Sequence, residues 1–137
     1  MNGENMEIEQ ILKTYHTVAM VGASPNPDRI SNQVFNYLTK HGYKVIPVNP
    51  AAAEVSGEKC YASLSAIPEK IDVVDIFRRS EDCLSIVEEA IKSGAKAVWM
   101  QEGVVNGEAE ARALTAGLKV VMDKCMMKEH KRLAGQT

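Results

Sequence analysis

Five short apolar segments, each separated from the next by a stretch of mostly helical periodicity, constrain the fold of this chain more than any other feature. They lie at residues 17–21, 43–48, 72–77, 96–100 and 118–122 and are rich in valine and isoleucine. Short β-branched runs of this kind are typical of buried strands. Strands that alternate with helices form βαβ units, whose right-handed crossovers place parallel strands in one sheet with both faces covered. The sequence therefore predicts a three-layer α/β/α domain with a five-stranded parallel sheet.

The segments between the strands carry start and stop signals for helices. The opening helix shows one apolar stripe: Ile8, Ile11, Leu12 and Tyr15. Later helices are expected to have N-caps at Ser31, Ser80 and Asn106, and glycines follow their ends at Gly42, Gly94 and Gly117. Residues 51–70 have no strong periodicity, and within them we expect only a short helix near residues 63–67.

Length and composition limit the class of protein. A chain of 137 residues with 45% hydrophobic residues can bury one core, so we expect a single domain over residues 1–137, with its core at about 8–133. The net charge is −2 and the 16 basic residues are scattered, which argues against a nucleic-acid partner. No run approaches the roughly 20 apolar residues of a membrane span. The three cysteines are widely spaced without a CxxC motif, which favours a cytoplasmic protein without a metal site.

The loop after the first predicted strand is the most informative candidate for a ligand site. Open parallel sheets bind ligands beyond the carboxyl ends of their strands, where the strand order reverses. Gly22 directly follows the strand, and a glycine there lets the backbone approach a pyrophosphate that faces the next helix N-terminus. The GxGxxG motif is absent, however, and Pro25 and Pro27 stiffen the loop. An ordinary βα turn therefore remains open as an alternative.

The second strand end helps to discriminate between nucleotide ligands. Nicotinamide cofactors usually require an acidic residue there for the ribose hydroxyls, but this chain has Val48, Asn49 and Pro50. That disfavours NAD and leaves room for a phosphorylated ribose. Candidate phosphate partners are Arg29, Arg78 and Arg79, and a charge-assisted hydrogen bond from one of them contributes roughly 1.5–3 kcal/mol. A solvated strand end is the competing interpretation of the arginine pair.

Five blocks of sequence together resemble the small stand-alone CoA-binding domain proteins, relatives of the CoA-binding domain in the succinyl-CoA synthetase α subunit. The blocks are VGASP at 21–25, GYKVIPVNP at 42–50, DIFRRSE at 75–81, WMQEG at 99–103 and DKCMMKEH at 123–130. The resemblance implies a Rossmann-like fold in which the first loop holds the pyrophosphate of coenzyme A or an acyl-CoA. By position, the implied ligand-binding residues are Gly22, Ala23, Ser24, Arg29, Val48, Asn49, Pro50, Ile76, Phe77, Arg78, Gln101 and Gly103.

Evidence for catalysis is weak, because no nucleophile and base converge at the predicted strand ends. The synthetase's catalytic histidine has no counterpart in this chain, so no catalytic residue is assigned. Cys125 follows the last strand near Lys124 and Lys128, and it is a candidate for a mixed disulfide with the CoA thiol. A buried, idle cysteine is the alternative.

The sequence thus favours a CoA-binding or acyl-CoA-binding protein that acts without catalysis as a sensor, carrier or regulatory module. Alternatives are an enzyme component, either an acyl-CoA ligase-like subunit or an NAD(P)-binding oxidoreductase, and an interaction module without ligand. We expect a small nucleotide ligand and no membrane partner. The sequence leaves open a homodimer or a partner enzyme subunit.

Overall fold

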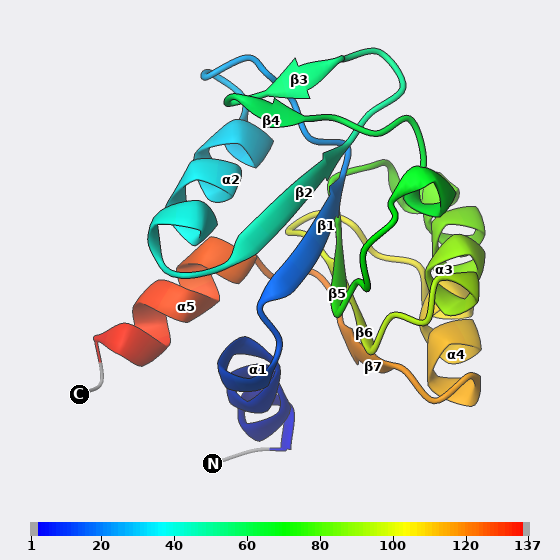
Figure 1. The fold of residues 1–137 in the computed structure, drawn as a ribbon. Coiled ribbons are helices and arrows are strands. Elements are labelled where there is room, and N and C mark those ends of the chain that lie inside the picture. Colours follow the sequence, from blue (N-terminus) through cyan, green and yellow to red (C-terminus); the bar gives the residue numbers. More distant parts are fainter. Residues whose placement is uncertain (1–2, 136–137) are drawn as a thin grey trace.

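A parallel sheet forms the centre of the protein, as the computed structural model of residues 3–135 shows (Figure 1). Its strands are β1 (Thr17–Val21), β2 (Lys44–Val48), β5 (Val73–Ile76), β6 (Ala97–Met100) and β7 (Lys119–Val121). They lie in the order β2-β1-β5-β6-β7, and every neighbouring pair is parallel. The five predicted strands and the three-layer Rossmann-like architecture are therefore confirmed.

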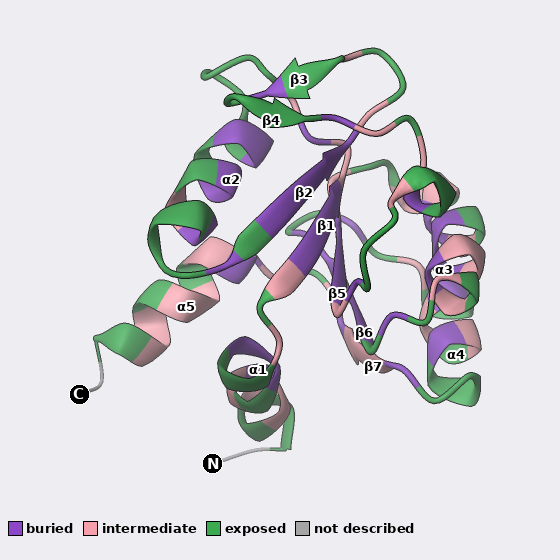
Figure 2. Cartoon of the chain, viewed as in Figure 1, coloured by how far each residue is buried: buried purple, intermediate pink, exposed green. Residues whose placement is uncertain are grey.

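Helices cover both faces of the sheet. The helices α1 (Gly3–Thr14), α2 (Ile30–Lys40) and α5 (Met126–Ala134) pack on one face, and α3 (Cys83–Lys92) and α4 (Gly107–Thr115) on the other. Each face has its own apolar cluster, and the strands between them are largely buried (Figure 2). Within residues 3–135, no helix has the length and apolar character needed to cross a bilayer.

The stretch without periodicity contains a structure that the sequence did not predict. A small antiparallel hairpin, β3 (Glu54–Val55) and β4 (Glu58–Lys59), lies beyond the end of β2 (Figure 1). Its turn holds Ser56 and Gly57 at φ values of 49° and 82°. The expected short helix is a 3-10 turn, Leu64–Ala66. Tyr61 pairs with Val48 and brings this segment beside the end of β2.

Two of the three predicted N-caps are wrong. The helix α2 begins at Ile30 after Arg29, so Ser31 lies inside its first turn. Ser80 belongs to a 3-10 turn, Ser80–Asp82, and its hydroxyl accepts the N–H of Val105 at 2.9 Å instead of capping α3. Asn106 is confirmed as a cap, because its side-chain oxygen accepts the N–H of Ala109 at 2.9 Å.

Candidate functional site

The sheet order creates a switch point between β1 and β5. From β1, the chain crosses to β2 on one side and later returns to β5 on the other. The loops after these strands therefore diverge at the carboxyl edge and leave space between them, which is where open α/β sheets hold ligands.

Gly22 ends β1 in a position that only glycine can occupy. Its φ is +90°, and a Cβ atom built on it would lie 2.2 Å from the backbone oxygen of Phe77. Its N–H donates to the carbonyl of Val48 at 2.9 Å, and the N–H of Phe77 donates to the carbonyl of Val21 at 2.8 Å. Gly22 thus lets the ends of β2, β1 and β5 meet as closely as the sheet requires.

A hollow of about 340 Å³ opens over this glycine, and we call it the arginine pocket. Its lining residues are Gly22, Ser24, Arg29, Ile30, Ser31, Asn49, Phe77 and Arg78. The lining residues include two arginines and no acidic residue. Ile30 and Ser31 belong to the first turn of α2, whose unpaired N–H groups carry a partial positive charge. The arginine pocket therefore suits an anion.

Side-chain amides brace the loop that forms one wall of this pocket. Asn32 donates from Nδ2 to the carbonyl of Ser24 at 2.8 Å, and Asn49 donates from Nδ2 to the carbonyl of Ala23 at 2.8 Å. The hydroxyl of Ser24 accepts the N–H of Asn26 at 3.1 Å. The loop is thereby fixed to α2 and to the end of β2 by contacts within the chain.

A second hollow of about 210 Å³, the α3 pocket, adjoins the first and shares Gly22 and Arg78 with it. Its lining residues are Val21, Gly22, Val48, Pro50, Ala62, Ser63, Leu64, Arg78, Asp82, Ser85, Ile86 and Glu89. This wall combines apolar side chains with two carboxylates, Asp82 just before α3 and Glu89 within it, and with the hydroxyls of Ser63 and Ser85. The two pockets therefore differ in charge, and Arg78 stands between them.

The structure brings together eight of the twelve residues that the sequence indicated for ligand binding. These line one or both pockets: Gly22, Ser24, Arg29, Val48, Asn49, Pro50, Phe77 and Arg78. Ala23 and Ile76 lie beside them but are fully buried in the core. Arg79, the third candidate cation, lines neither pocket and has a side chain that is 75% exposed.

Gln101 and Gly103 do not close a wall of these pockets, contrary to the expectation from resemblance. Both lie after β6, and neither lines the arginine pocket or the α3 pocket. Gln101 is buried, and the N–H of Gly103 donates to Asp123 at 2.7 Å. The ends of β6 and β7 are thus tied to each other, on the far side of β5 from the arginine pocket.

Cys125 also lies on this side of the edge, after β7, and is only 2% exposed, as the N-cap residue of α5. The neighbouring cations are engaged elsewhere: Lys124 with Glu4 at 3.7 Å and Lys128 with Glu102 at 2.8 Å. This placement favours the buried, idle cysteine over a thiol that awaits CoA. Among residues 3–135, no three His, Cys, Asp or Glu side chains are grouped as metal ligands would be.

The residues that sequence reasoning missed come from two places. Ala62, Ser63 and Leu64 reach the α3 pocket because Tyr61 pairs with Val48, a long-range contact without local signal. Asp82, Ser85 and Glu89 lie at the start of α3 and along it, and the spacing of three to four residues from Asp82 to Ser85 to Glu89 is the one sequence feature that could have indicated them.

A buried carboxyl group lies in the sheet near this site. Asp75 on β5 is fully buried between its register neighbours Met20 and Trp99, and neither of its carboxyl oxygens has a hydrogen-bond partner among the described residues. Burial raises the pKa of Asp75 from 3.8 to about 8. Asp75 is therefore largely protonated at neutral pH.

Comparison with known proteins finds relatives of similar length to this chain. Residues 16–131 match the CoA-binding domain family. The uncharacterized protein YneT of Bacillus subtilis is 40% identical over 129 residues, which cover 94% of this chain and 96% of that protein. A hypothetical protein from Pyrococcus horikoshii has a solved structure that superposes with a TM-score of 0.93 and 50% identity over 96% of this chain and 92% of that one.

The chain also resembles one part of a larger enzyme. The structure of acetyl-coenzyme A synthetase 1 from Ca. Korarchaeum cryptofilum, in complex with phosphate and ADP, matches with a TM-score of 0.71 and 31% identity. The match covers 83% of this chain but only 27% of the synthetase. The family match, the similar relatives and the shared fold lead to one conclusion: this chain belongs to the CoA-binding domain family.

Proposed function

We propose that the protein binds coenzyme A, or an acyl-CoA, in the groove formed by the arginine pocket and the α3 pocket. The observation that carries the proposal is the arginine pocket itself, where Arg29, Arg78 and the first turn of α2 surround a space without any carboxylate. A diphosphate is the part of CoA that fits such a space, because charge-assisted hydrogen bonds and a helix N-terminus both favour an anion.

The α3 pocket supports an extended ligand. It continues from the shared Gly22 and Arg78 into a space that is lined by both apolar and polar side chains. CoA extends on both sides of its diphosphate, with an uncharged pantetheine arm on one side and adenine on a phosphorylated ribose on the other, so one part can lie in each direction along the groove. The side chain of Asn49 is used in bracing the loop, through Ala23 and through the N–H of Ala51 at 2.9 Å, and offers no carboxylate to the ribose of NAD.

The proposed role is that of a sensor, carrier or regulatory module rather than a self-sufficient enzyme. The groove contains no convergent nucleophile and base among its lining residues. An acyl-CoA ligase-like subunit is the second candidate, and the likeness to about a quarter of an acetyl-coenzyme A synthetase favours it. That candidate requires a partner subunit that supplies the remaining parts of the reaction.

The test is calorimetric titration with CoA, acetyl-CoA, NAD, NADP and ATP. CoA or acetyl-CoA should bind most tightly, and at a hundredfold excess over Kd it should stabilise the protein by about 2.7 kcal/mol. Arg78→Gln should weaken CoA binding by about tenfold, the loss expected for one charge-assisted phosphate contact. Lys128→Gln is the matched control, since Lys128 pairs with Glu102 away from the groove.

Preferred binding of NAD would favour the oxidoreductase alternative. Absence of binding by all five ligands would favour an interaction module. Either result would contradict the proposal.

A further inference from the structure

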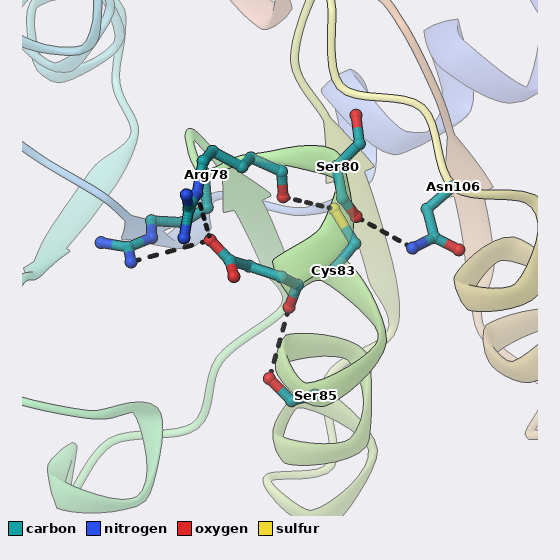
Figure 3. Close-up of polar contacts among 7 residues, drawn as sticks. Arg78, Ser80, Cys83, Ser85 and Asn106 are labelled. Atoms are coloured by element: carbon teal, nitrogen blue, oxygen red, sulfur yellow. Dashed lines mark hydrogen bonds and ion pairs between the residues drawn. The ribbon is translucent and has the colours of Figure 1, made fainter.

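One carboxylate in the groove is shared by both members of the arginine pair. Asp82 Oδ2 lies 3.8 Å from a terminal nitrogen of Arg78 and 3.5 Å from Nε of Arg79. Figure 3 shows the surroundings of Arg78, with Ser80 in the preceding 3-10 turn and Cys83 and Ser85 at the start of α3. Among the described residues, neither arginine forms an ion pair with any other carboxylate.

The two arginines differ in their relation to the groove. Arg78 lines both pockets, whereas Arg79 lines neither and extends into solvent. An anion in the arginine pocket therefore competes with Asp82 for Arg78 only. If Arg78 turned to such an anion, Asp82 would keep Arg79 as a partner.

The carboxylate of Asp82 does not cap the helix α3. Asp82 precedes α3 but makes no side-chain capping hydrogen bond, and Ser85 donates to its backbone carbonyl, at 3.3 Å, rather than to its carboxylate. Its side chain is 27% exposed, so its charge acts on the groove through partly excluded solvent. An isosteric change to asparagine would remove the charge without removing a helix cap.

From this arrangement we propose that Asp82 is a positioning residue that sets the affinity of the groove for phosphate, and that Arg79 opposes it. Asp82 holds Arg78 back from the ligand in the free protein. Arg79 draws the same carboxylate away and so favours release of Arg78. This inference rests on the proposed function of the groove, because the competing anion is the CoA diphosphate.

The expected effects have opposite signs. Partly exposed ion pairs contribute at most about 1 kcal/mol, so Asp82→Asn should tighten CoA binding by about threefold to fivefold. Arg79→Gln leaves Asp82 with Arg78 alone and should weaken binding by about twofold. A gain of affinity on removal of a groove residue is an effect that loss of folding would not produce.

The test is a set of double-mutant cycles, with CoA affinity measured by calorimetry at one fixed ionic strength. In the Arg78→Gln background, Asp82→Asn should no longer tighten binding. In the Asp82→Asn background, Arg79→Gln should no longer weaken it. Glu81→Gln removes the same charge one residue away, and Glu81 pairs with neither arginine in the described part of the chain, so it should leave affinity unchanged.

Two results would overturn the proposal. If Asp82→Asn tightens binding equally with and without Arg78, its carboxylate acts only by direct repulsion of the ligand. If Glu81→Gln has the same effect as Asp82→Asn, the effect is one of net charge. Failure of the unaltered protein to bind CoA would instead contradict the proposed function, so the two failures are distinguishable.

Discussion

The carboxyl edge of the sheet has two halves that are built from the same kind of buried parallel strand but differ in their loops. After β2, β1 and β5, the loops diverge and leave the arginine pocket and the α3 pocket. After β6 and β7, the loops are joined by the Gly103–Asp123 hydrogen bond and the bond from Trp99 to the carbonyl of Lys124 at 2.8 Å. The end of a strand is therefore a candidate site only where its loop diverges from the loop of the neighbouring strand.

Gly22 and Gly103 give the strongest test of this difference. Both have positive φ values, of 90° and 82°, but only Gly22 has the Phe77 carbonyl where its Cβ would be, and Gly103 has open space. Gly22→Ala should destabilise the protein by about 3 kcal/mol or more, from backbone strain plus overlap. Gly103→Ala should cost about 1 kcal/mol. Chemical denaturation measures both, and equal losses would contradict the close approach at Gly22.

Asp75 lies on β5, in the half of the sheet edge that holds the two pockets, and its burial should lower the free energy of unfolding at neutral to basic pH. Its raised pKa, about 8 against 3.8, means that the folded state holds a proton which the unfolded state releases. Stability should therefore fall as pH rises from about 4 to about 8, by at most about 1.4 kcal/mol per pH unit from this group.

Asparagine keeps the shape of the neutral side chain but does not titrate. Asp75→Asn should flatten that slope and raise the free energy of unfolding at pH 8, measured by urea titration across the pH range. An unchanged slope would mean that Asp75 is ionised in the folded protein.

Arg29 allows CoA affinity to be compared between the half of the edge that holds the pockets and the half after β6 and β7. It is the second cation of the arginine pocket and forms no ion pair among residues 3–135, so no carboxylate of the described chain competes for it. Arg29→Gln should weaken CoA binding by about fivefold to tenfold. Lys124→Gln should leave the affinity unchanged, because Lys124 lies after β7, pairs with Glu4 and lines neither pocket. Equal losses for the two variants would indicate a general charge effect rather than a contact.

Cys125 should give the smallest effect. Because its thiol is buried beside α5, incubation with oxidised CoA should give no adduct on intact-protein mass spectrometry, and Cys125→Ser should leave CoA affinity unchanged. An adduct that Cys125→Ser abolishes would show that this half of the edge opens.

The sequence was sufficient for the sheet because its strands are short, apolar and β-branched, and both faces are covered. It was insufficient for the hairpin, since Glu54–Val55 and Glu58–Lys59 are short, mostly polar pairs with no periodicity. The N-cap at Ser80 was wrong because its hydroxyl has a distant partner, Val105. Local patterns do not encode such long-range competition for a polar group.

The residues of the candidate site likewise divide into those that local sequence patterns predict and those that long-range packing places. Gly22, Asn49 and Arg78 lie at or just beyond strand ends, so their places in the groove could be predicted from the chain alone. Leu64 and Glu89 reach the groove only through the packing of the segment after β4 and of α3. Gly103 lines neither pocket, and its N–H is bonded to Asp123, a distant partner that a resemblance by position does not reveal.

The most direct measurement is a CoA titration followed through the backbone amide resonances of the labelled protein. We predict that the amides of Gly22, Ser24 and Ser31 shift with a single Kd, while those of Gly103 and Cys125 stay in place. Shifts confined to Gly103 and Cys125, with the loop after β1 unchanged, would contradict the proposed groove.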